Sequence, residues 1–190
     1  RIKSLVFSTD LSIIKNVNAD AIIAVYPFTP QPIITQALLL AADIPVFAGV
    51  GGGLTKGQRV VNLAMFAEMQ GATGVVLNAP TANAVVQHVA ETIDIPVVVT
   101  VARADTDFDA RLQAGANIFN VSAAAETPAI VRSIRERYPD VPIIATGGPT
   151  DESILETIQA GANAITWTPP TNGEIFRDIM AAYRENKPHP

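Results

Sequence analysis

An internal repeat constrains the fold of this chain more than any other feature of its sequence. One repeated unit is Asp-Ile-Pro or Asp-Val-Pro before an apolar run, and it begins at Asp43, Asp94 and Asp140. The other unit is Gly-Ala-Thr or Gly-Ala-Asn before a second apolar run, and it begins at Gly71, Gly115 and Gly161. The two units alternate along the chain, so each period of the repeat holds two expected strands.

The apolar runs predict parallel strands. They are short, rich in Val and Ile, and apolar at nearly every position, which is typical of strands covered on both faces. Between them lie helical patterns such as 57–70 and 151–160, and the repeated glycines stand where a helix ends in a left-handed residue. The expected strands are 4–9, 20–26, 44–49, 73–79, 95–101, 117–122, 141–147 and 163–168.

Eight parallel strands in strict alternation with helices predict an α/β fold, a single (β/α)8 or TIM barrel. The chain has 190 residues, so the loops must be minimal. We expect the barrel to occupy residues 1–184 and a polar, Pro-rich tail to fray over 185–190. An open doubly wound sheet is the alternative, but it needs a reversal of strand order that the even repeat does not indicate.

Composition excludes several classes of function. The chain has no Cys and two His, so disulfides, thiolate zinc sites and cysteine nucleophiles are excluded. The 13 Lys and Arg are scattered against 18 Asp and Glu, which argues against nucleic acid as a partner. No apolar run reaches the roughly 18 residues of a membrane helix. We therefore predict a cytoplasmic protein, and a charged fraction of 16% suggests a homo-oligomer with covered outer helices.

The chemistry of such barrels lies at the carboxyl ends of the strands. Asp10 follows the first expected strand, where it could be a general acid or base, or the N-cap of a short first helix. Asn78 and Asn120 end the fourth and sixth strands, where their amides could orient a carbonyl or satisfy loop backbone groups. We predict Asp10, Asn78 and Asn120 as the catalytic residues, with Glu126 as a weaker carboxylate candidate.

Two cations stand near the same rim. Arg103 could clamp an anionic group, or pair with neighbouring Asp105. Lys56 lies in the Gly-rich segment 49–57, which fails the spacing of a nucleotide-binding loop. The segment could still form an anion-binding lid, and the alternative is a solvated Lys in a mobile turn. Tyr26 and Ser122, at the ends of the second and sixth strands, complete the predicted substrate contacts.

The seventh expected strand ends in Gly147-Gly148 before a helix start. Adjacent glycines let backbone N–H groups approach an anion, although such a pair could also merely turn the chain. The segment VPIIATGGPTDESILETIQAGANAI, Val141 to Ile165, resembles the seventh-strand region of the phosphate-binding barrels. That superfamily includes ketodeoxyphosphogluconate aldolases, thiamine phosphate synthase, ribulose-phosphate epimerase and, more distantly, inosinate dehydrogenases.

The resemblance implies a phosphate site at Gly147 and Gly148, but this chain departs from the superfamily elsewhere. Pro169 and Pro170 stand where a second Gly-rich turn would complete the phosphate site. Aldolases of the group use a Lys on the sixth strand as a Schiff base, and this chain has Asn120 there. The resemblance therefore implies no Schiff-base chemistry for this protein.

These observations predict a metabolic enzyme acting on a small anionic metabolite, phosphorylated or carboxylated. A lyase or isomerase acting next to a carbonyl is the favoured interpretation, and a hydrolase on the same barrel is the alternative. A non-catalytic metabolite-binding or regulatory barrel is the second class of interpretation. No cofactor is specified by the sequence, and a divalent metal held by carboxylate and amide oxygens is left open.

Overall fold

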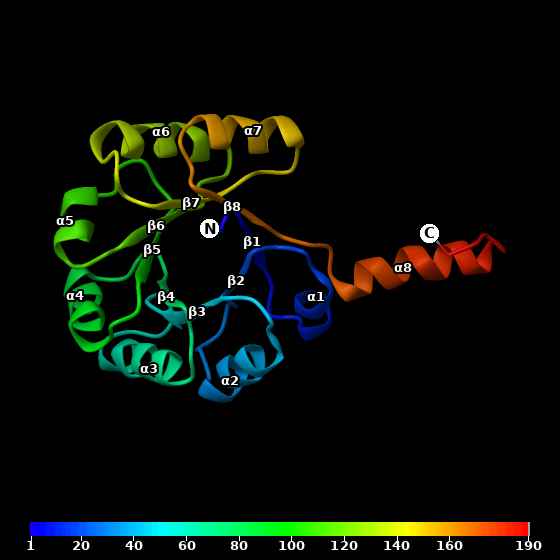
Figure 1. Ribbon diagram of the computed structural model, residues 1–190, viewed down its shortest axis with the longest axis horizontal. Helices are drawn as coiled ribbons and strands as arrows, with labels where there is room; N and C mark the ends of the chain where they lie inside the picture. The colour runs from blue at the N-terminus through cyan, green and yellow to red at the C-terminus, as the bar shows by residue number, and fades with distance from the viewer. Residues whose placement is uncertain (190) are drawn as a thin grey trace.

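The computed structural model describes residues 1–189, and its strands form one closed parallel barrel in which β8 pairs with β1 (Figure 1). This confirms the predicted (β/α)8 barrel. The strands are β1 (Ser4–Phe7), β2 (Ala21–Ala24), β3 (Val46–Gly51), β4 (Gly74–Leu77), β5 (Val97–Val101), β6 (Ile118–Val121), β7 (Ile143–Thr146) and β8 (Ala164–Trp167). The helices are α1 (Leu11–Asn16), α2 (Pro32–Ala41), α3 (Gln58–Met69), α4 (Asn83–Thr92), α5 (Phe108–Gln113), α6 (Thr127–Arg137), α7 (Asp151–Gln159) and α8 (Asn172–Arg184).

Each expected strand is present, most of them slightly shorter than expected. The third strand is displaced, because Gly51 continues the pairing with Leu77 of β4 beyond an irregularity after Gly49. The repeated glycines do end helices, with φ of 96° at Gly71, 99° at Gly115 and 113° at Gly161. The repeat therefore locates both the strands and the ends of the helices that precede them.

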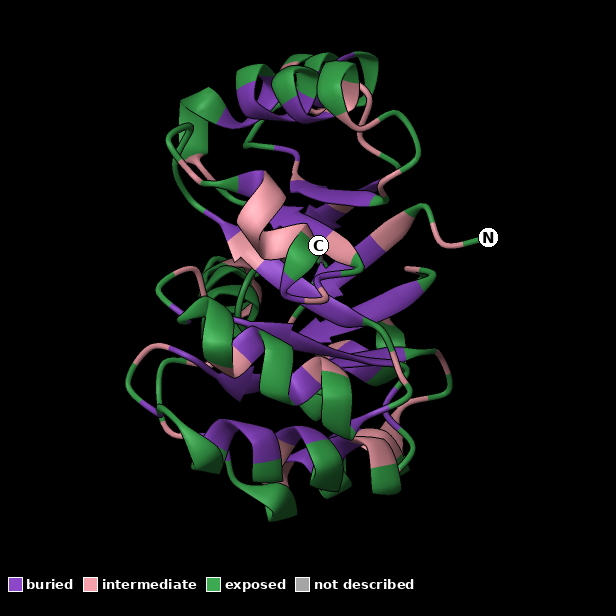
Figure 2. Ribbon diagram, turned by 90° about the vertical axis from the view of Figure 1, so that its left-hand side faces the viewer, coloured by how far each residue is buried: buried purple, intermediate pink, exposed green. Residues whose placement is uncertain are grey.

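The core has an inner and an outer layer. Alternate residues of the strands fill the interior of the barrel, and this set comprises Leu5, Ala21, Ile23, Phe47, Val76, Val98, Ile144 and Ala164. The other strand faces pack against the inner sides of the helices in two further clusters. Figure 2 shows the same division, with buried strands inside and exposed outer helix faces. Since the interior is packed, it has no room for a ligand, and the active sites of such barrels lie at the rim.

Helix α8 differs from the other helices. It extends away from the barrel in Figure 1, and none of its residues is buried. The barrel expected over residues 1–184 therefore includes a helix that lies outside the ring of the other helices. Fraying is expected from residue 185, but the next three residues continue the hydrogen bonding of α8. Their backbone amides donate to the carbonyls of the last turn, from Glu185, Asn186 and Lys187 to Ala181, Ala182 and Tyr183. Pro190, the last residue of the expected tail, lies outside the described residues.

Across residues 1–189, the helices fall short of the length and apolar character needed to cross a lipid bilayer.

Candidate active site

Five polar side chains surround the barrel axis at the carboxyl ends of neighbouring strands. Each stands two residues after a residue of the barrel interior, so the alternation of a strand turns it toward the axis. We call this set the polar crown, and it consists of Asn78, Thr100, Asn120, Thr146 and Thr166. The crown carries amides and hydroxyls and no charge, so it can hold a ligand by hydrogen bonds from several directions.

One hydroxyl of the crown is buried without a partner. Asn120 is 9% exposed and its Nδ2 donates to Thr100 Oγ1 at 3.4 Å. Thr166 is 7% exposed, and its Oγ1 has no hydrogen-bond partner among the described residues. An unsatisfied buried hydroxyl costs about 1–3 kcal/mol. Thr166 therefore marks a position where a ligand oxygen or nitrogen would relieve that cost.

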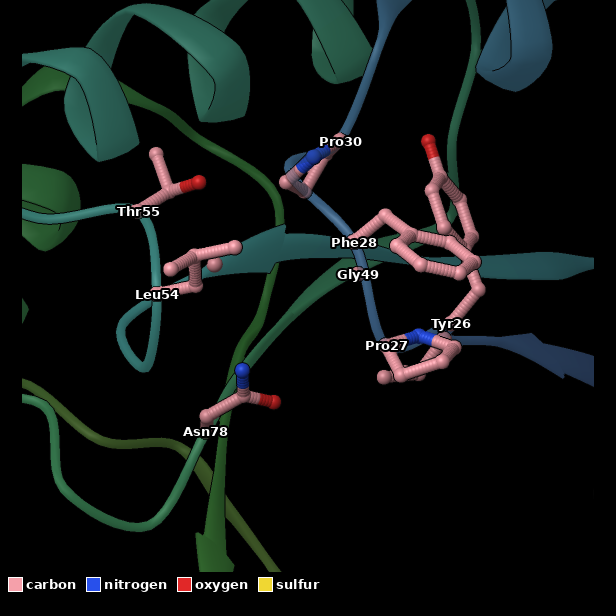
Figure 3. Close-up of a pocket in the computed structure, with 10 residues that line it drawn as sticks. Tyr26, Pro27, Phe28, Pro30, Gly49, Leu54, Thr55 and Asn78 are labelled. Carbon is pink, nitrogen blue, oxygen red and sulfur yellow. The ribbon is translucent and has the colours of Figure 1, made fainter.

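A cavity of about 90 Å³ opens beside the crown, between the loops that follow β2 and β3. Figure 3 shows Phe28 and Leu54 on opposite sides of this opening, with the Asn78 amide pointing in between them and Gly49 on the strand behind. Phe28 is 70% exposed and Leu54 is 78% exposed. Two large apolar side chains at an opening are suited to cover a bound ligand and to exclude water from it.

Asp10 is the N-cap of α1, which confirms one of its two interpretations. Its Oδ1 accepts from the Ser12 amide at 2.9 Å, the Ser12 hydroxyl at 2.8 Å and the Ile13 amide at 3.3 Å. The hydrogen bond from the Ser12 hydroxyl, with the two amides, holds the pKa of Asp10 below its ordinary value against the opposing effect of desolvation. Asp10 is thus an ionised carboxylate whose Oδ1 already accepts three hydrogen bonds from the first turn of α1. Its catalytic role stays a prediction.

The two predicted cations are exposed. Arg103 forms a bidentate pair with Asp105, at 2.9 Å and 2.7 Å, and its side chain is 78% exposed. Its interpretation as the partner of Asp105 is confirmed. Lys56 is also exposed. The loop before Lys56 is packed against the barrel, unlike an open lid. Gly51 and Gly52 are buried, and a Cβ on Gly52 would overlap the Thr81 hydroxyl.

Tyr26 and Ser122 lie on the rim but outside the crown. The Tyr26 hydroxyl accepts from the Gln31 amide at 2.8 Å, and in Figure 3 it points away from Asn78. The ring of Tyr26 still lines the cavity. Ser122 is exposed directly after β6, where its amide donates to the Val101 carbonyl at 2.8 Å. Substrate contact by either residue stays a prediction.

Local packing and backbone conformation explain why the Gly147-Gly148 turn needs two glycines. A Cβ on Gly147 would lie 2.7 Å from Ile154 Cγ1 and 2.8 Å from Ile165 Cγ2, and Gly148 has a φ of 82°. The first turn of α7 carries Asp151 and Glu152, which oppose a bound phosphate. The turn therefore fits the chain-turning interpretation, and phosphate binding there stays a prediction.

Glu126, the weaker carboxylate candidate, and two other titratable side chains, Asp107 and His88, lie away from the crown. Glu126 ends the short 3-10 turn before α6 and borders a groove between α5 and α6. Asp107 caps α5, accepting from the Ala110 amide at 3.0 Å. His88 is exposed on α4. Of the predicted site residues, the structure brings Asn78 and Asn120 into the crown.

The three threonines of the crown are not among the site residues predicted from the sequence. Thr100 is aligned with Asn120 across β5 and β6, and Thr146 is aligned with Thr166 across β7 and β8. The signal that could have found them is the alternation itself. A polar residue two positions after a buried aliphatic residue, near a strand end, faces the axis.

No family model matches this chain, and no curated protein matches it. Solved structures of several enzymes are similar to it. A phosphonomutase candidate from Burkholderia cenocepacia J2315 aligns with a TM-score of 0.75 and 15% identity, over 96% of this chain and 92% of that one. A phosphonopyruvate hydrolase aligns with a TM-score of 0.72 and 14% identity, over 98% of this chain and 84% of that one.

A 2,3-dimethylmalate lyase, described as a member of the PEP mutase/isocitrate lyase superfamily, aligns with a TM-score of 0.70 and 13% identity. The alignment covers 97% of this chain and 80% of that one. Identities this low show the fold alone. The comparisons thus support the (β/α)8 barrel. They do not point to the phosphate-binding barrels that the segment 141–165 resembles.

Proposed function

We propose that this barrel is a small-molecule metabolic enzyme, a lyase or isomerase that acts next to a carbonyl on an anionic metabolite without a Schiff-base Lys. The observation that carries the proposal is the buried, unpaired hydroxyl of Thr166 in the polar crown. A polar group left unsatisfied in a packed barrel is retained at a cost, and binding a substrate oxygen there recovers it.

The crown would act by orienting and stabilising charge. The amide N–H groups of Asn78 and Asn120 and the Thr166 hydroxyl can donate to a carbonyl oxygen that becomes negative as a neighbouring bond breaks or forms. Donors fixed in a water-poor site stabilise such an oxygen more strongly than water does. Asp10, kept ionised by its lowered pKa, is the proposed proton acceptor, and it would have to release part of its capping interactions to act.

A carboxylate is the anionic group that the rim favours over a phosphate. Asp151 and Glu152 begin α7 beside the Gly147-Gly148 turn, whereas the crown offers neutral donors that suit a carboxylate. Lys56 and Arg103 are the proposed cations that would approach the bound anion from the loops. Two similar structures are named for carboxylate-bearing metabolites, 2,3-dimethylmalate and phosphonopyruvate, of which the second also carries a phosphonate.

A divalent metal, which the sequence leaves open, would have few protein ligands in this structure. One structure of the similar phosphonopyruvate hydrolase is a complex with oxalate and Mg²⁺. Mg²⁺ is held by carboxylates together with water and substrate oxygens. Among residues 1–189, no three His, Cys, Asp or Glu side chains gather to hold a metal ion. The proposed chemistry uses the crown, Asp10, Lys56 and Arg103, and a divalent metal stays a prediction.

A non-catalytic metabolite-binding barrel is the second candidate, and a specific observation favours it. Asp10 is already occupied as an N-cap and by Asn172, which donates to its Oδ2 at 2.6 Å. If both oxygens of Asp10 keep these structural hydrogen bonds, the barrel could bind a ligand at the crown without catalysing a reaction. A hydrolase on the same barrel is the alternative among enzymes.

Titration calorimetry with pyruvate, oxalate and phosphonopyruvate, combined with NMR detection of product, tests these proposals. Thr166→Val keeps the shape of the side chain and removes the hydroxyl, and we expect it to weaken binding about tenfold, as for one lost hydrogen bond. Thr157→Val is the matched control, because Thr157 is also buried but its hydroxyl donates to the Ser153 carbonyl of α7 and is not part of the crown. Binding that Thr166→Val leaves unchanged would place the ligand elsewhere, and binding without turnover would favour the non-catalytic barrel.

A further inference from the structure

Helix α8 carries an apolar face that the described part of its own chain leaves largely open, where the His189 ring meets Tyr183 edge to face at 6.0 Å. Ile175, Phe176, Met180 and Tyr183 are exposed, with Phe176 at 63% and Tyr183 at 48%. Their spacing places them on one side of the helix, and Arg177, Ala181 and Arg184 lie on the other. The helix is well formed, since Thr171 and Glu174 make a complete capping box at its start. A stable amphipathic helix with an open apolar face indicates a missing partner.

A second apolar surface is open on the barrel itself, and we call it the uncovered face. It consists of Leu155 and Ile158 on α7 and Trp167 on β8, which are 53%, 48% and 47% exposed. Trp167 follows Ile165 on the outside of β8, and Ile165 lies against Ile154 of α7 at the Gly147 turn. This is the place that an eighth helix occupies in a complete ring of a (β/α)8 barrel.

The orientation of α7 supports this placement. Ser153, Glu156 and Thr157 of α7 border a cavity shared with Ala124 and Pro128, so they face the α6 side. Ile158 lies about 160° round the helix from Glu156, and therefore faces the position between α7 and α1, with Leu155 next to it on the solvent side. Figure 1 shows that α8 leaves the barrel from this same region.

The segment that joins β8 to α8 directs the helix outward. Pro169 and Pro170 restrict the backbone to extended conformations, and Thr171 is extended with a ψ of 157°. Asn172 then donates to Asp10 Oδ2 and to the Ser12 hydroxyl at 2.7 Å, which fixes the first turn of α8 beside α1. Folding α8 back over its own barrel would require these contacts to break.

We propose that α8 of one copy packs on the uncovered face of a second copy, and that the second copy returns its own α8 in the same way. A reciprocal exchange closes with twofold symmetry and gives both apolar surfaces a partner. A 13-residue helix is about 20 Å long and about 10 Å across, so the exchange buries on the order of 1,200 Å² in total, which is within the range of specific interfaces. The occupant of the uncovered face is thus the same chain.

Light scattering after size-exclusion chromatography tests the exchange at micromolar concentration of the full chain. We expect a dimer for the wild type, and a monomer for Phe176→Glu, with a dissociation constant raised at least tenfold. Ala181→Glu is the matched control, because it adds the same charge on the same helix about 140° round from Phe176, and it should stay dimeric. A monomeric wild type, or a dimer that Phe176→Glu does not weaken, would overturn the proposal.

Trp167 is the single Trp of the chain, so its fluorescence reports on the uncovered face directly. The indole is about half exposed in one copy, and a docked helix would remove it from water. We expect Phe176→Glu to shift the emission to longer wavelength than in the wild type, and Ala181→Glu to leave it unchanged. An identical spectrum for Phe176→Glu and the wild type would contradict docking at Trp167.

Cross-linking separates exchange from a helix that folds back on its own barrel. The chain has no Cys, so Met180→Cys and Ile158→Cys can be introduced in separate copies and mixed. We expect a bismaleimide to join the two variants into a covalent dimer. Cross-linking found only within one chain, when both substitutions are combined in it, would show a folded-back helix and would overturn the exchange.

Discussion

Asn172 Nδ2 donates to Asp10 Oδ2 at 2.6 Å and so joins the first turn of α8 to the N-cap of α1, across 162 residues of sequence. This contact occupies the oxygen of Asp10 that the cap of α1 leaves open. It also sets the position from which α8 leaves the barrel. One carboxylate thus supports a helix start, an outward-directed helix and, in our proposal, the chemistry at the rim.

Asp10→Ala should lower the free energy of unfolding by about 1 kcal/mol, the usual cost of a lost N-cap. Asp10→Asn should cost less, because Asn also caps well. Urea unfolding of the three proteins measures both differences. Equal stability of Asp10→Ala and the wild type would mean that the cap is not formed in solution.

The stabilisation from Asp10 should depend on pH with a defined sign. Its pKa is lowered in the fold from an ordinary value of 3.8, chiefly by the Ser12 hydroxyl. Because the ionised form is favoured by folding, its contribution is present above that ordinary value and is lost as pH falls through the folded pKa. Asp10→Asn removes this dependence. The melting temperatures of the two proteins should therefore draw together below about pH 4, and a constant gap would contradict the lowered pKa.

Gly147→Ala should destabilise the barrel by about 1–3 kcal/mol, as overpacking does. The added Cβ would lie 2.7 Å from Ile154 Cγ1 and 2.8 Å from Ile165 Cγ2, so α7 must move from the sheet. Gly173→Ala is the control, since its Cβ would meet nothing nearer than 3.9 Å. In a helix that change should be neutral or stabilising by up to about 1 kcal/mol. Thermal unfolding compares the two, and equal effects would show that the close packing at Gly147 is absent.

Arg111→Met should cost about 1–3 kcal/mol, because buried carbonyls lose a charged donor. The Arg111 guanidinium donates to the Ala79 carbonyl at 2.8 Å, to Asn83 Oδ1 at 2.8 Å and to the Thr81 carbonyl. Burial also lowers the pKa of Arg111. Arg103→Met is the matched control, since its pair with Asp105 is exposed to water and should contribute little to stability. Urea unfolding that ranks Arg103→Met as the more damaging change would contradict these assignments.

Thr166→Val should leave the ligand-free protein as stable as the wild type, or more stable by up to about 1 kcal/mol. The hydroxyl that it removes is buried and unpaired among residues 1–189, so its loss relieves an unmet hydrogen bond. Thr157→Val should be destabilising, because the Thr157 hydroxyl donates to the Ser153 carbonyl at 2.8 Å. Differential scanning calorimetry distinguishes the two, and a large loss for Thr166→Val would reveal a structural role for its hydroxyl.

The candidate site was only partly predictable. Asn78 and Asn120 could be placed because they end apolar runs, and strand ends meet at the rim of a barrel. Arg103 and Asp10 also follow strands, but their side chains satisfy local partners, Asp105 and the first turn of α1. Whether a polar side chain faces the axis or its own loop depends on strand register and helix starts, which a list of strand ends does not contain.

The barrel could be predicted from the sequence, since alternating runs of fixed spacing can bury both faces of parallel strands only when helices surround them. The sequence also determined which chemistries are absent, because the chain has no Cys and few His. Tertiary structure alone decided that Thr166 is left without a partner and that α8 lies outside the ring. The physical reason is that both depend on long-range contacts, the register of β8 against its neighbours and the bond between Asn172 and Asp10, which join residues far apart in the chain.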